Sequence, residues 1–245
     1  MTPLIALTRT ELKLTLREPL AAFFTLVFPL MILVMFGSIF GNDRAETSDG
    51  WGAMDLSVQG YFAMIIGTVT LLGLPVVVST YREYKIFRRM RATPLRPISI
   101  ILAHTVVQLT MTTLGLAILL IGGVALFDLR MPVNPAGVIA GTLVSFLAFA
   151  SIGFLIGGVA GTSRTAQVVG NVFYFPQLFL AGAAMPREFF PETLRTWTAW
   201  LPMTQVVNVI KDPWKGEPLD VVAFAILVVA GVACALISSK VFRWE

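Results

Sequence analysis

Charge and reactive side chains are scarce in this sequence. Asp, Glu, Lys and Arg make up 13% of its 245 residues, whereas soluble domains average about 25%. A single cysteine, Cys234, excludes a disulfide within the chain, and with a single histidine, His104, no His/Cys metal cluster can form. His104 has no G-x-S-x-G sequence near it, which disfavours a serine hydrolase. We therefore predict no catalytic residue and no metal site, we give His104 no role, and we expect a protein that is not itself an enzyme.

The sequence also lacks the G-x-x-x-x-G-K-[ST] loop, so the chain cannot hold ATP by the phosphate-cradle route. The central parts of its apolar stretches contain no acidic residue, whereas proton- and sodium-coupled transporters usually carry acidic residues there. If the chain moves a solute, another protein supplies the energy or the chain is a passive pore. We expect this chain to bind no cofactor of its own.

Apolar residues are abundant: they form 56% of the chain and give a mean hydropathy of +0.82. Most of the six apolar stretches reach the ~20 residues that a helix needs to cross ~30 Å of hydrocarbon. Lipid forces backbone polar groups to pair within each segment, and the stretches do not alternate as barrel strands do, so they should be helices. We predict an all-α integral membrane protein with one transmembrane domain over residues 1–245. Its six spans are residues 20–40, 58–80, 98–127, 136–160, 168–184 and 219–239.

The loops between these stretches alternate in basic charge. Twelve of the 18 Lys and Arg residues fall in the termini and loops on one side, and six fall on the other side. The positive-inside rule places the more basic side, and with it both termini, in the cytoplasm. This placement accounts for the net charge of +4 without nucleic acid as a partner. We predict a multi-pass protein of the cell membrane.

The segment before the first span carries charge at helical spacing. Arg9, Lys13 and Arg17 recur every four residues, so they form one basic stripe on a helix over residues 3–18. Such a helix can lie at the membrane interface, with its cations among the phosphates of membrane lipids. The alternative is a basic terminus that only sets orientation. The order of the stripe favours the interfacial helix.

The loop between residues 81 and 97 is the most charged part of the chain. Residues 81–93 are compatible with a helix that stops at Thr93-Pro94, and Pro97 suits the first turn of the next span. The six cations of this loop are enough to fix orientation, but orientation does not account for the apolar side chains among them. Because exposed apolar content marks interaction sites, we favour a surface that docks another protein.

Span four has glycines at four-residue spacing, namely Gly153, Gly157 and Gly161. Small residues at this spacing let two helices approach closely within a membrane. We predict a packing role for all three.

Three prolines interrupt the segment after the fifth span. Pro186, Pro191 and Pro202 divide residues 186–211 into two short helical pieces, each too short to cross the membrane. Short helices at membrane depth are tolerated only against protein or a wet cavity. We predict a re-entrant cap at the outer side. An ordinary surface loop is the alternative.

Two stretches of the sequence carry a family resemblance. The first covers residues 81–94, from Y-R-E to R-A-T-P. The second is F-L-A-G-A-A-M-P over residues 179–186, followed by P-E-T-L over 191–194 and L-P over 201–202. With the basic N-terminus and the six spans, these stretches resemble the permease subunit of type-2 exporter-class ABC transporters, especially the DrrB-like daunorubicin-resistance branch of multidrug permeases.

The resemblance implies one subunit of a larger exporter. This chain would pair with a second permease, identical or homologous, above two cytoplasmic ABC ATPase subunits that bind ATP and Mg²⁺. The substrate would be a hydrophobic drug or a lipid-like molecule. A coupling helix over residues 81–93 would contact the ATPase. The residues implied in that contact are Arg82, Glu83, Lys85, Phe87, Arg88 and Arg89.

The resemblance also implies site residues at the outer end and along the fifth span. Pro186, Pro191 and Pro202 would shape the outer cap. Aromatic side chains of the fifth span suit an apolar ligand, although lipid-facing or dimer-packing roles for them stay open. The implied candidates for the substrate path are Asn171, Phe173, Tyr174, Phe175 and Gln177.

Two other functions compete with this interpretation. One is a permease of the same class that exports a lipid-linked glycan or another polymer, which would need a wider tunnel. The other is a membrane scaffold or sensor whose basic loop binds a signalling partner. The broken helices after the fifth span count against a scaffold, because a scaffold has no need of them.

Overall fold

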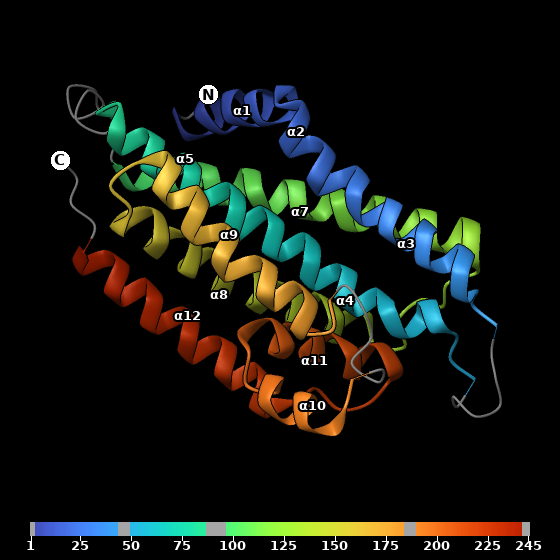
Figure 1. Cartoon of the computed structure of the whole chain (residues 1–245). Helices are drawn as coiled ribbons and strands as arrows, with labels where there is room; N and C mark the ends of the chain where they lie inside the picture. The colour runs from blue at the N-terminus through green and yellow to red at the C-terminus, as the bar shows by residue number, and fades with distance from the viewer. Residues whose placement is uncertain (1–2, 44–49, 87–96, 184–189, 242–245) are drawn as a thin grey trace.

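A computed structural model describes residues 3–43, 50–86, 97–183 and 190–241 (Figure 1). Within these residues the chain forms helices joined by short connections, and no β-strand occurs. The N-terminal helices are α1 (Pro3–Arg17), α2 (Pro19–Ala22), the π-helical η1 (Phe23–Val27) and α3 (Phe28–Phe40). One continuous rod then combines α4 (Ala53–Gly67), the π-helical η3 (Thr68–Gly73) and α5 (Leu74–Glu83). The remaining helices are α7 (Pro97–Phe127), α8 (Pro135–Val159), α9 (Ser163–Leu180), α10 (Glu192–Thr198), α11 (Pro202–Lys215) and α12 (Val221–Val241).

Five helical segments are long and apolar enough to cross a membrane. They are Phe23–Phe40, Ala53–Glu83, Ile101–Phe127, Pro135–Val159 and Val221–Lys240. The predicted fifth span corresponds to α9, which has 18 residues but falls outside this group. Its hydropathy is lowered by Arg164, Gln167, Asn171 and Gln177. Five of the six predicted spans are therefore matched by apolar helices.

Both π-helical segments come just before a proline. Pro29 and Pro75 each occupy the first turn of the helix that follows η1 or η3. Proline cannot donate the i→i−4 hydrogen bond, and its ring crowds the carbonyl of the preceding turn. A π-helical turn loosens the ladder at such a point and lets the helix continue. The two rods Phe23–Phe40 and Ala53–Glu83 thus stay unbroken.

The α4–α5 rod lies at the centre of the bundle. In the most apolar 18-residue stretch of this rod, 72% is buried inside the chain. The corresponding share is 22% for both Phe23–Phe40 and Val221–Lys240. Figure 1 places α1, the end of α5, the start of α9 and the end of α12 toward one end of the bundle. The start of α4 and the short helices α10 and α11 lie toward the other end.

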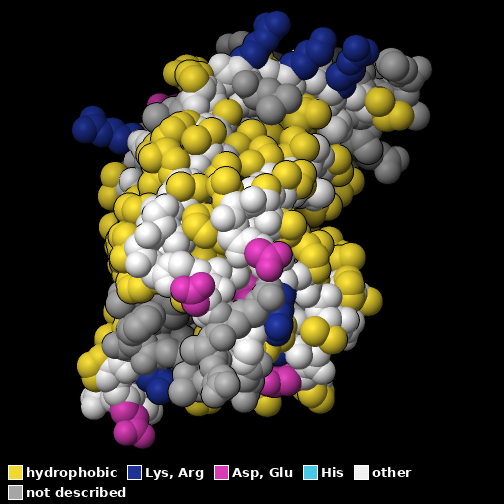
Figure 2. Space-filling model, turned by 90° about the vertical axis from the view of Figure 1, so that its right-hand side faces the viewer, with side chains coloured by type: hydrophobic (Ala, Val, Ile, Leu, Met, Phe, Trp, Pro, Cys, Tyr) yellow, Lys and Arg dark blue, Asp and Glu magenta, His cyan; other side chains and the backbone are white. Residues whose placement is uncertain are grey.

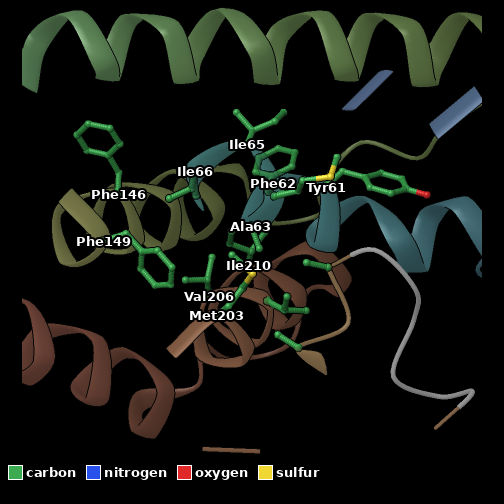
Figure 3. Packing of buried hydrophobic residues seen from close by; sticks show 14 of the residues in the cluster. Tyr61, Phe62, Ala63, Ile65, Ile66, Phe146, Phe149, Met203, Val206 and Ile210 are labelled. Atoms are coloured by element: carbon green, nitrogen blue, oxygen red, sulfur yellow. The ribbon is translucent and has the colours of Figure 1, made fainter. Parts of the chain in front are cut away.

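Helix α11 is packed inside the bundle at that second end. It begins at Pro202 and ends before Gly216, whose φ of 85° suits a glycine after a helix. Its apolar side chains pack against α4, α8 and α12, and Figure 3 shows Met203, Val206 and Ile210 beside Ala63. Helix α11 is therefore packed within the bundle, whereas residues 192–197 of α10 are exposed. Two helices, α10 and α11, occupy this segment, and α11 extends to Lys215, beyond the predicted end at residue 211. A re-entrant cap in the membrane stays a prediction.

Two of the three span-four glycines have the predicted packing role. A Cβ at Gly153 would overlap the Thr70 backbone oxygen, and one at Gly157 would lie 2.9 Å from the Pro75 oxygen. The backbones of α8 and of the central rod therefore meet directly at these two residues. Gly161 has nothing within 4 Å of such a Cβ, so its predicted packing role is wrong.

A polar knot joins three helices at the second end of the bundle. The carboxylate of Asp55, which is fully buried, accepts hydrogen bonds from Gly52 N (3.0 Å) and Arg130 N (2.9 Å). Asn42 accepts from Asp55 N (3.2 Å) through Oδ1 and donates to Phe127 O (2.9 Å). These contacts tie the ends of α3 and α7 to the start of α4.

The segment predicted as an interfacial helix corresponds to α1, and its place at a membrane interface stays a prediction. Arg9, Lys13 and Arg17 are all exposed. Figure 2 shows a row of Lys and Arg side chains along the top of the molecule, the side on which Figure 1 places α1. The opposite side of α1 packs on α7.

Candidate functional site

The site begins where the central rod ends. Tyr81, Arg82 and Glu83 form the last turn of α5, and Lys85 then adopts a left-handed conformation with φ of 56°. A left-handed residue interrupts an α-helix, so the prediction of one helix running from 81 to 93 is wrong at its start. Residues 87–96, which include the predicted contacts Phe87, Arg88 and Arg89, lie outside the described residues.

Arg82 holds the end of α8. Its guanidinium donates hydrogen bonds to the carbonyl oxygens of Gly157 (3.3 Å), Gly158 and Ala160 (3.1 Å). The last carbonyls of a helix have no partner within the helix and carry the negative end of its dipole. All three hydrogen bonds come from Nη1 of Arg82, whose N–H groups are shared among the three carbonyls at this helix end.

Glu83 holds the start of α9 in the complementary way. Its Oε2 accepts from the backbone N–H and from the hydroxyl of Ser163, at 2.9 Å each. The first N–H groups of a helix lack internal partners and carry the positive end of the dipole, which favours a carboxylate there. Thr162 caps the same helix end by accepting from Thr165 N at 3.2 Å.

Two consecutive residues of α5 therefore fix both sides of the α8–α9 connection. The positive Arg82 meets a helix C-terminus and the negative Glu83 meets a helix N-terminus, so each charge suits the end that it contacts. A displacement of the last turn of α5 would carry the end of α8 and the start of α9 with it. Sequence reasoning proposed Arg82 and Glu83 as partner contacts and missed these contacts within the chain.

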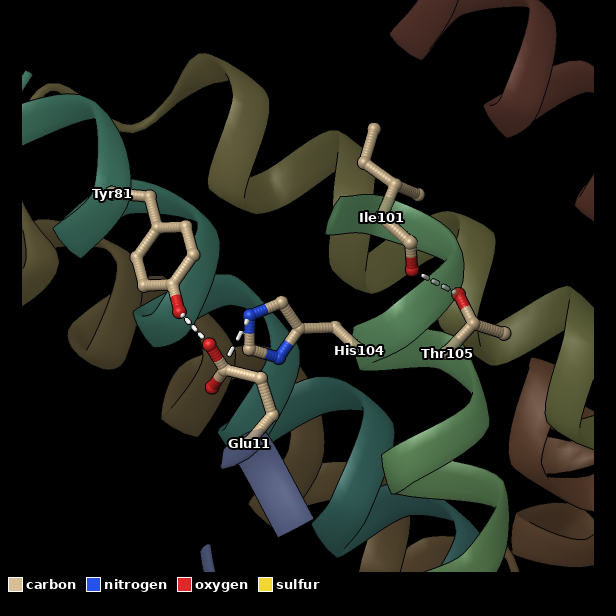
Figure 4. Close-up of polar contacts among 5 residues, drawn as sticks. All are labelled: Glu11, Tyr81, Ile101, His104 and Thr105. Atoms are coloured by element: carbon tan, nitrogen blue, oxygen red, sulfur yellow. Dashed lines mark hydrogen bonds and ion pairs between the residues drawn. The ribbon is translucent and has the colours of Figure 1, made fainter. Parts of the chain in front are cut away.

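A second polar cluster lies beside this site, where α1, α5 and α7 meet (Figure 4). The Tyr81 hydroxyl donates to Glu11 Oε1 at 2.5 Å, and His104 Nε2 lies 3.8 Å from Glu11 Oε2. The rings of Tyr81 and His104 meet edge to face, with centroids 5.1 Å apart. Sequence reasoning gave His104 no role. A signal was present: Glu11 is two residues from Arg9, so it faces away from the basic stripe toward the buried side of α1.

The predicted cap prolines that the structure describes lie at helix starts. Pro191 precedes the first residue of α10, and Pro202 is the first residue of α11. Pro186 lies outside the described residues. Gln177 of α9 secures the start of α11, because its Oε1 accepts from Met203 N at 3.1 Å. Trp197 of α10 is 79% exposed.

The five predicted path residues of α9 separate into two groups. Tyr174 and Gln177 are buried, and the Tyr174 hydroxyl lies 2.8 Å from Thr68 Oγ1 of the central rod. Asn171 and Phe173 are half-buried and Phe175 is exposed. The structure thus does not bring the five together on one surface.

Comparison with known proteins identifies a family of transporters. Residues 2–212 match the family model described as ABC-2 type transporter. The chain is also 29% identical over 94 residues to Nodulation protein J of Rhizobium leguminosarum bv. viciae, a match that covers 38% of this chain and 35% of that protein. The match thus spans about a third of the relative. Because the family model covers most of the sequence, the chain belongs to the ABC-2 type transporter family of membrane permeases.

Proposed function

We propose that this chain is the membrane subunit of an ATP-driven exporter. It would pair with a second permease, identical or homologous, and would be energised by two cytoplasmic ABC ATPase subunits that hold the ATP and Mg²⁺. The observation that carries the proposal is the clamp of Arg82 and Glu83 on the α8–α9 connection. It links the segment that would dock the ATPase to two further helices of the bundle.

The force would enter through the residues that follow α5. Tyr84 is 64% exposed and Lys85 is exposed, so the chain turns outward directly after the clamp. Phe87, Arg88 and Arg89 would extend this surface onto the ATPase. Closure of the ATPase pair would then tilt α5, and α8 and α9 would follow through Arg82 and Glu83.

In this proposal α9 is a sixth span, and both termini lie in the cytoplasm of a cell-membrane protein. The clamp end of the bundle carries α1 with its exposed basic row, which suits a membrane surface on the cytoplasmic side (Figure 2). A helix as polar as α9 crosses a membrane more favourably when one side is packed on protein, and α9 is packed on the central rod.

The substrate path and the second permease would share the outer side of α9. An apolar stripe there consists of Val168, Val172, Phe175 and Phe179, with 47% to 68% of each side chain exposed. A hydrophobic drug or lipid-like substrate suits such a surface. We narrow the path candidates to Asn171, Phe173 and Phe175, because Tyr174 and Gln177 are occupied within the chain.

Purification of the tagged chain from its native membranes in mild detergent tests the proposal. We expect a stoichiometric soluble ATPase with a phosphate-binding loop to co-purify, and its ATP hydrolysis to fall when both Arg88 and Arg89 are changed to Glu. Absence of an ATPase from a folded, monodisperse preparation would overturn the proposal.

A further inference from the structure

The first turn of α11 needs a hydrogen-bond acceptor from another helix. Pro202 has no N–H group. The N–H groups of Thr204 and Gln205 both bind the Leu201 carbonyl oxygen, at 3.0 Å and 3.2 Å. The N–H of Met203 lies in the same turn, where a helix offers no internal acceptor, and Met203 is fully buried. A buried N–H without an acceptor is costly, so the partner of this one group decides how firmly α11 begins here.

Gln177 of α9 supplies that acceptor. Its Oε1 accepts from Met203 N at 3.1 Å, and its Nε2 donates to the Phe173 carbonyl oxygen at 2.8 Å. The amide has an opposite kind of partner at each of its two ends, which fixes its orientation. Gln177 is 5% exposed, and Leu201, the residue before α11, has an apolar side chain that cannot cap a helix. A residue of α9 therefore caps the start of α11.

Side chains of α9 and α11 also meet on the central rod. A Cβ at Gly67 of α4 would lie 2.6 Å from Met203 Cε and 2.7 Å from a ring carbon of Tyr174. Both side chains therefore occupy the space that this glycine leaves open. Tyr174 lies one turn before Gln177 on α9. The contact between α9 and α11 thus combines a buried hydrogen bond with close packing.

Helix α11 is bonded in turn to the end of α10. Thr204 Oγ1 donates to Thr198 O at 2.8 Å, and Gln205 Nε2 donates to Ala199 O at 2.5 Å. Both donors belong to the first turn of α11, next to Met203, and both acceptors are carbonyls at the end of α10. The two helices therefore form one hydrogen-bonded unit over residues 192–215, the α10–α11 unit. Gln177 binds this unit near the point where its two helices meet.

Helix α9 joins the clamp to the α10–α11 unit. It begins at Ser163, which is bound to Glu83, and it continues through Pro176 to Leu180 as one helix. At a rise of ~1.5 Å per residue, Ser163 and Gln177 lie about 21 Å apart along this helix. One helix is thus bound to α5 near one end of the bundle and to α11 near the other end.

We propose that Gln177 is the positioning residue through which α9 moves the α10–α11 unit, so that a displacement of α9 at the clamp displaces α11 at the other end of the bundle. A rigid helix that is bound to a different element at each end can carry a displacement from one to the other. The linkage rests on the proposed function for the origin of the movement at α5. It adds the residue through which that movement reaches the far end of the bundle.

Thiol modification at Val206→Cys measures the linkage in the full chain. Val206 of α11 is fully buried and lies beside Ala63 of the central rod (Figure 3), so N-ethylmaleimide reaches a cysteine there only while α11 is displaced. The protein carries Cys234→Ala and is reconstituted in phosphatidylcholine vesicles. Gln177→Met removes the acceptor at similar side-chain size. We expect it to raise the modification rate about fivefold or more, which is the population change expected from one lost hydrogen bond.

Gln167→Met is the matched control. Gln167 lies on the same helix and is exposed, so its replacement should leave the modification rate unchanged. If Gln177→Met does not fold, Gln177→Asn takes its place, because the shorter amide does not reach Met203 N. An unchanged rate at residue 206 in the Gln177 variant would overturn the proposal.

Combination with Glu83→Ala separates transmission from a local structural role. Distant substitutions without a shared partner act independently, so their effects on the rate multiply. If α9 transmits the state of the clamp through Gln177, Glu83→Ala raises the rate at residue 206 severalfold and adds nothing in the Gln177→Met background. No response to Glu83→Ala, or the same factor in both backgrounds, would overturn the linkage. No ATPase takes part in this measurement, so failure of the linkage would leave the proposed ATPase partner unaffected.

Discussion

The Glu83 carboxylate accepts both the backbone N–H and the hydroxyl of Ser163 through one oxygen, 80 residues away along the chain. Arg82, the residue before it, binds the last carbonyls of α8. A two-residue sequence at the end of one helix thus caps the C-terminus of a second helix and the N-terminus of a third. Charge and helix dipole agree at both contacts.

Loss of the Glu83 contact should uncouple α9 from α5. We expect Glu83→Ala to lower the transport-dependent ATP hydrolysis of the purified complex about fivefold or more, and Ser163→Ala to lower it less, because the backbone N–H still donates. Glu18→Ala is the matched control, since Glu18 is an exposed carboxylate outside the clamp. Equal activity in the Glu83 and Glu18 variants would contradict the coupling role.

Close packing of α8 on the central rod predicts that alanine is destabilising at one of its glycines and harmless at another. Gly153→Ala places a Cβ against the Thr70 backbone oxygen, which cannot give way as a flexible side chain can. We expect a destabilisation of about 1–3 kcal/mol, measured as a lower midpoint of thermal unfolding in detergent. Gly161→Ala meets nothing within 4 Å and should leave the midpoint unchanged. Similar midpoints for both variants would show that the helices are not in backbone contact.

The polar knot at the start of α4 predicts that Asp55 is structural. Asp55→Ala leaves the N–H groups of Gly52 and Arg130 without their acceptor in a buried place. We expect a loss of about 1–3 kcal/mol of unfolding free energy. Asp43→Ala, which removes an exposed carboxylate nearby, is the control and should cost little. Equal free energies of unfolding for the two variants would contradict a stabilising role for the hydrogen bonds of Asp55.

The two ends of α9 should lie on opposite sides of the membrane. Arg164 lies in the first turn of α9 and Glu192 is the first residue of α10, which follows it, and both are exposed. In a Cys234→Ala background, we expect a membrane-impermeant maleimide to label Glu192→Cys in intact cells and to label Arg164→Cys only after the cells are opened. Labelling of both from outside would place α9 on the surface and leave five spans.

Much of the fold follows from local patterns in the sequence. The hydropathy of the long stretches, the basic stripe of Arg9, Lys13 and Arg17, and the proline starts at Pro97 and Pro202 each reflect the energetics of nearby residues. The structure has helices at all of these places. The turn at Lys85 was not predictable in this way, because a left-handed lysine has no strong local signal.

The candidate site depended on contacts between distant residues. The sequence around Arg82 and Glu83 is typical of a docking surface. Nothing near these two residues in the sequence indicates that they bind Ser163 and the end of α8. His104 lies 93 positions after Glu11, so the sequence does not show that the two side chains meet. A lone histidine in an apolar helix resembles ordinary packing, and only the contact between α1 and α7 brings it to Glu11. Periodicity shows which side of a helix is buried, and it does not show which helix covers that side.

Site-specific photo-crosslinking from Tyr84 tests the central claim, that the end of α5 is where an ATPase acts on this chain. Tyr84 is 64% exposed, and replacement by a benzoylphenylalanine keeps an aromatic side chain at that position. In native membranes we predict an adduct between residue 84 and an ATPase with a phosphate-binding loop, and no such adduct from Trp197, which is 79% exposed at the other end of the bundle. No ATPase adduct from residue 84, or equal adducts from both positions, would contradict the account.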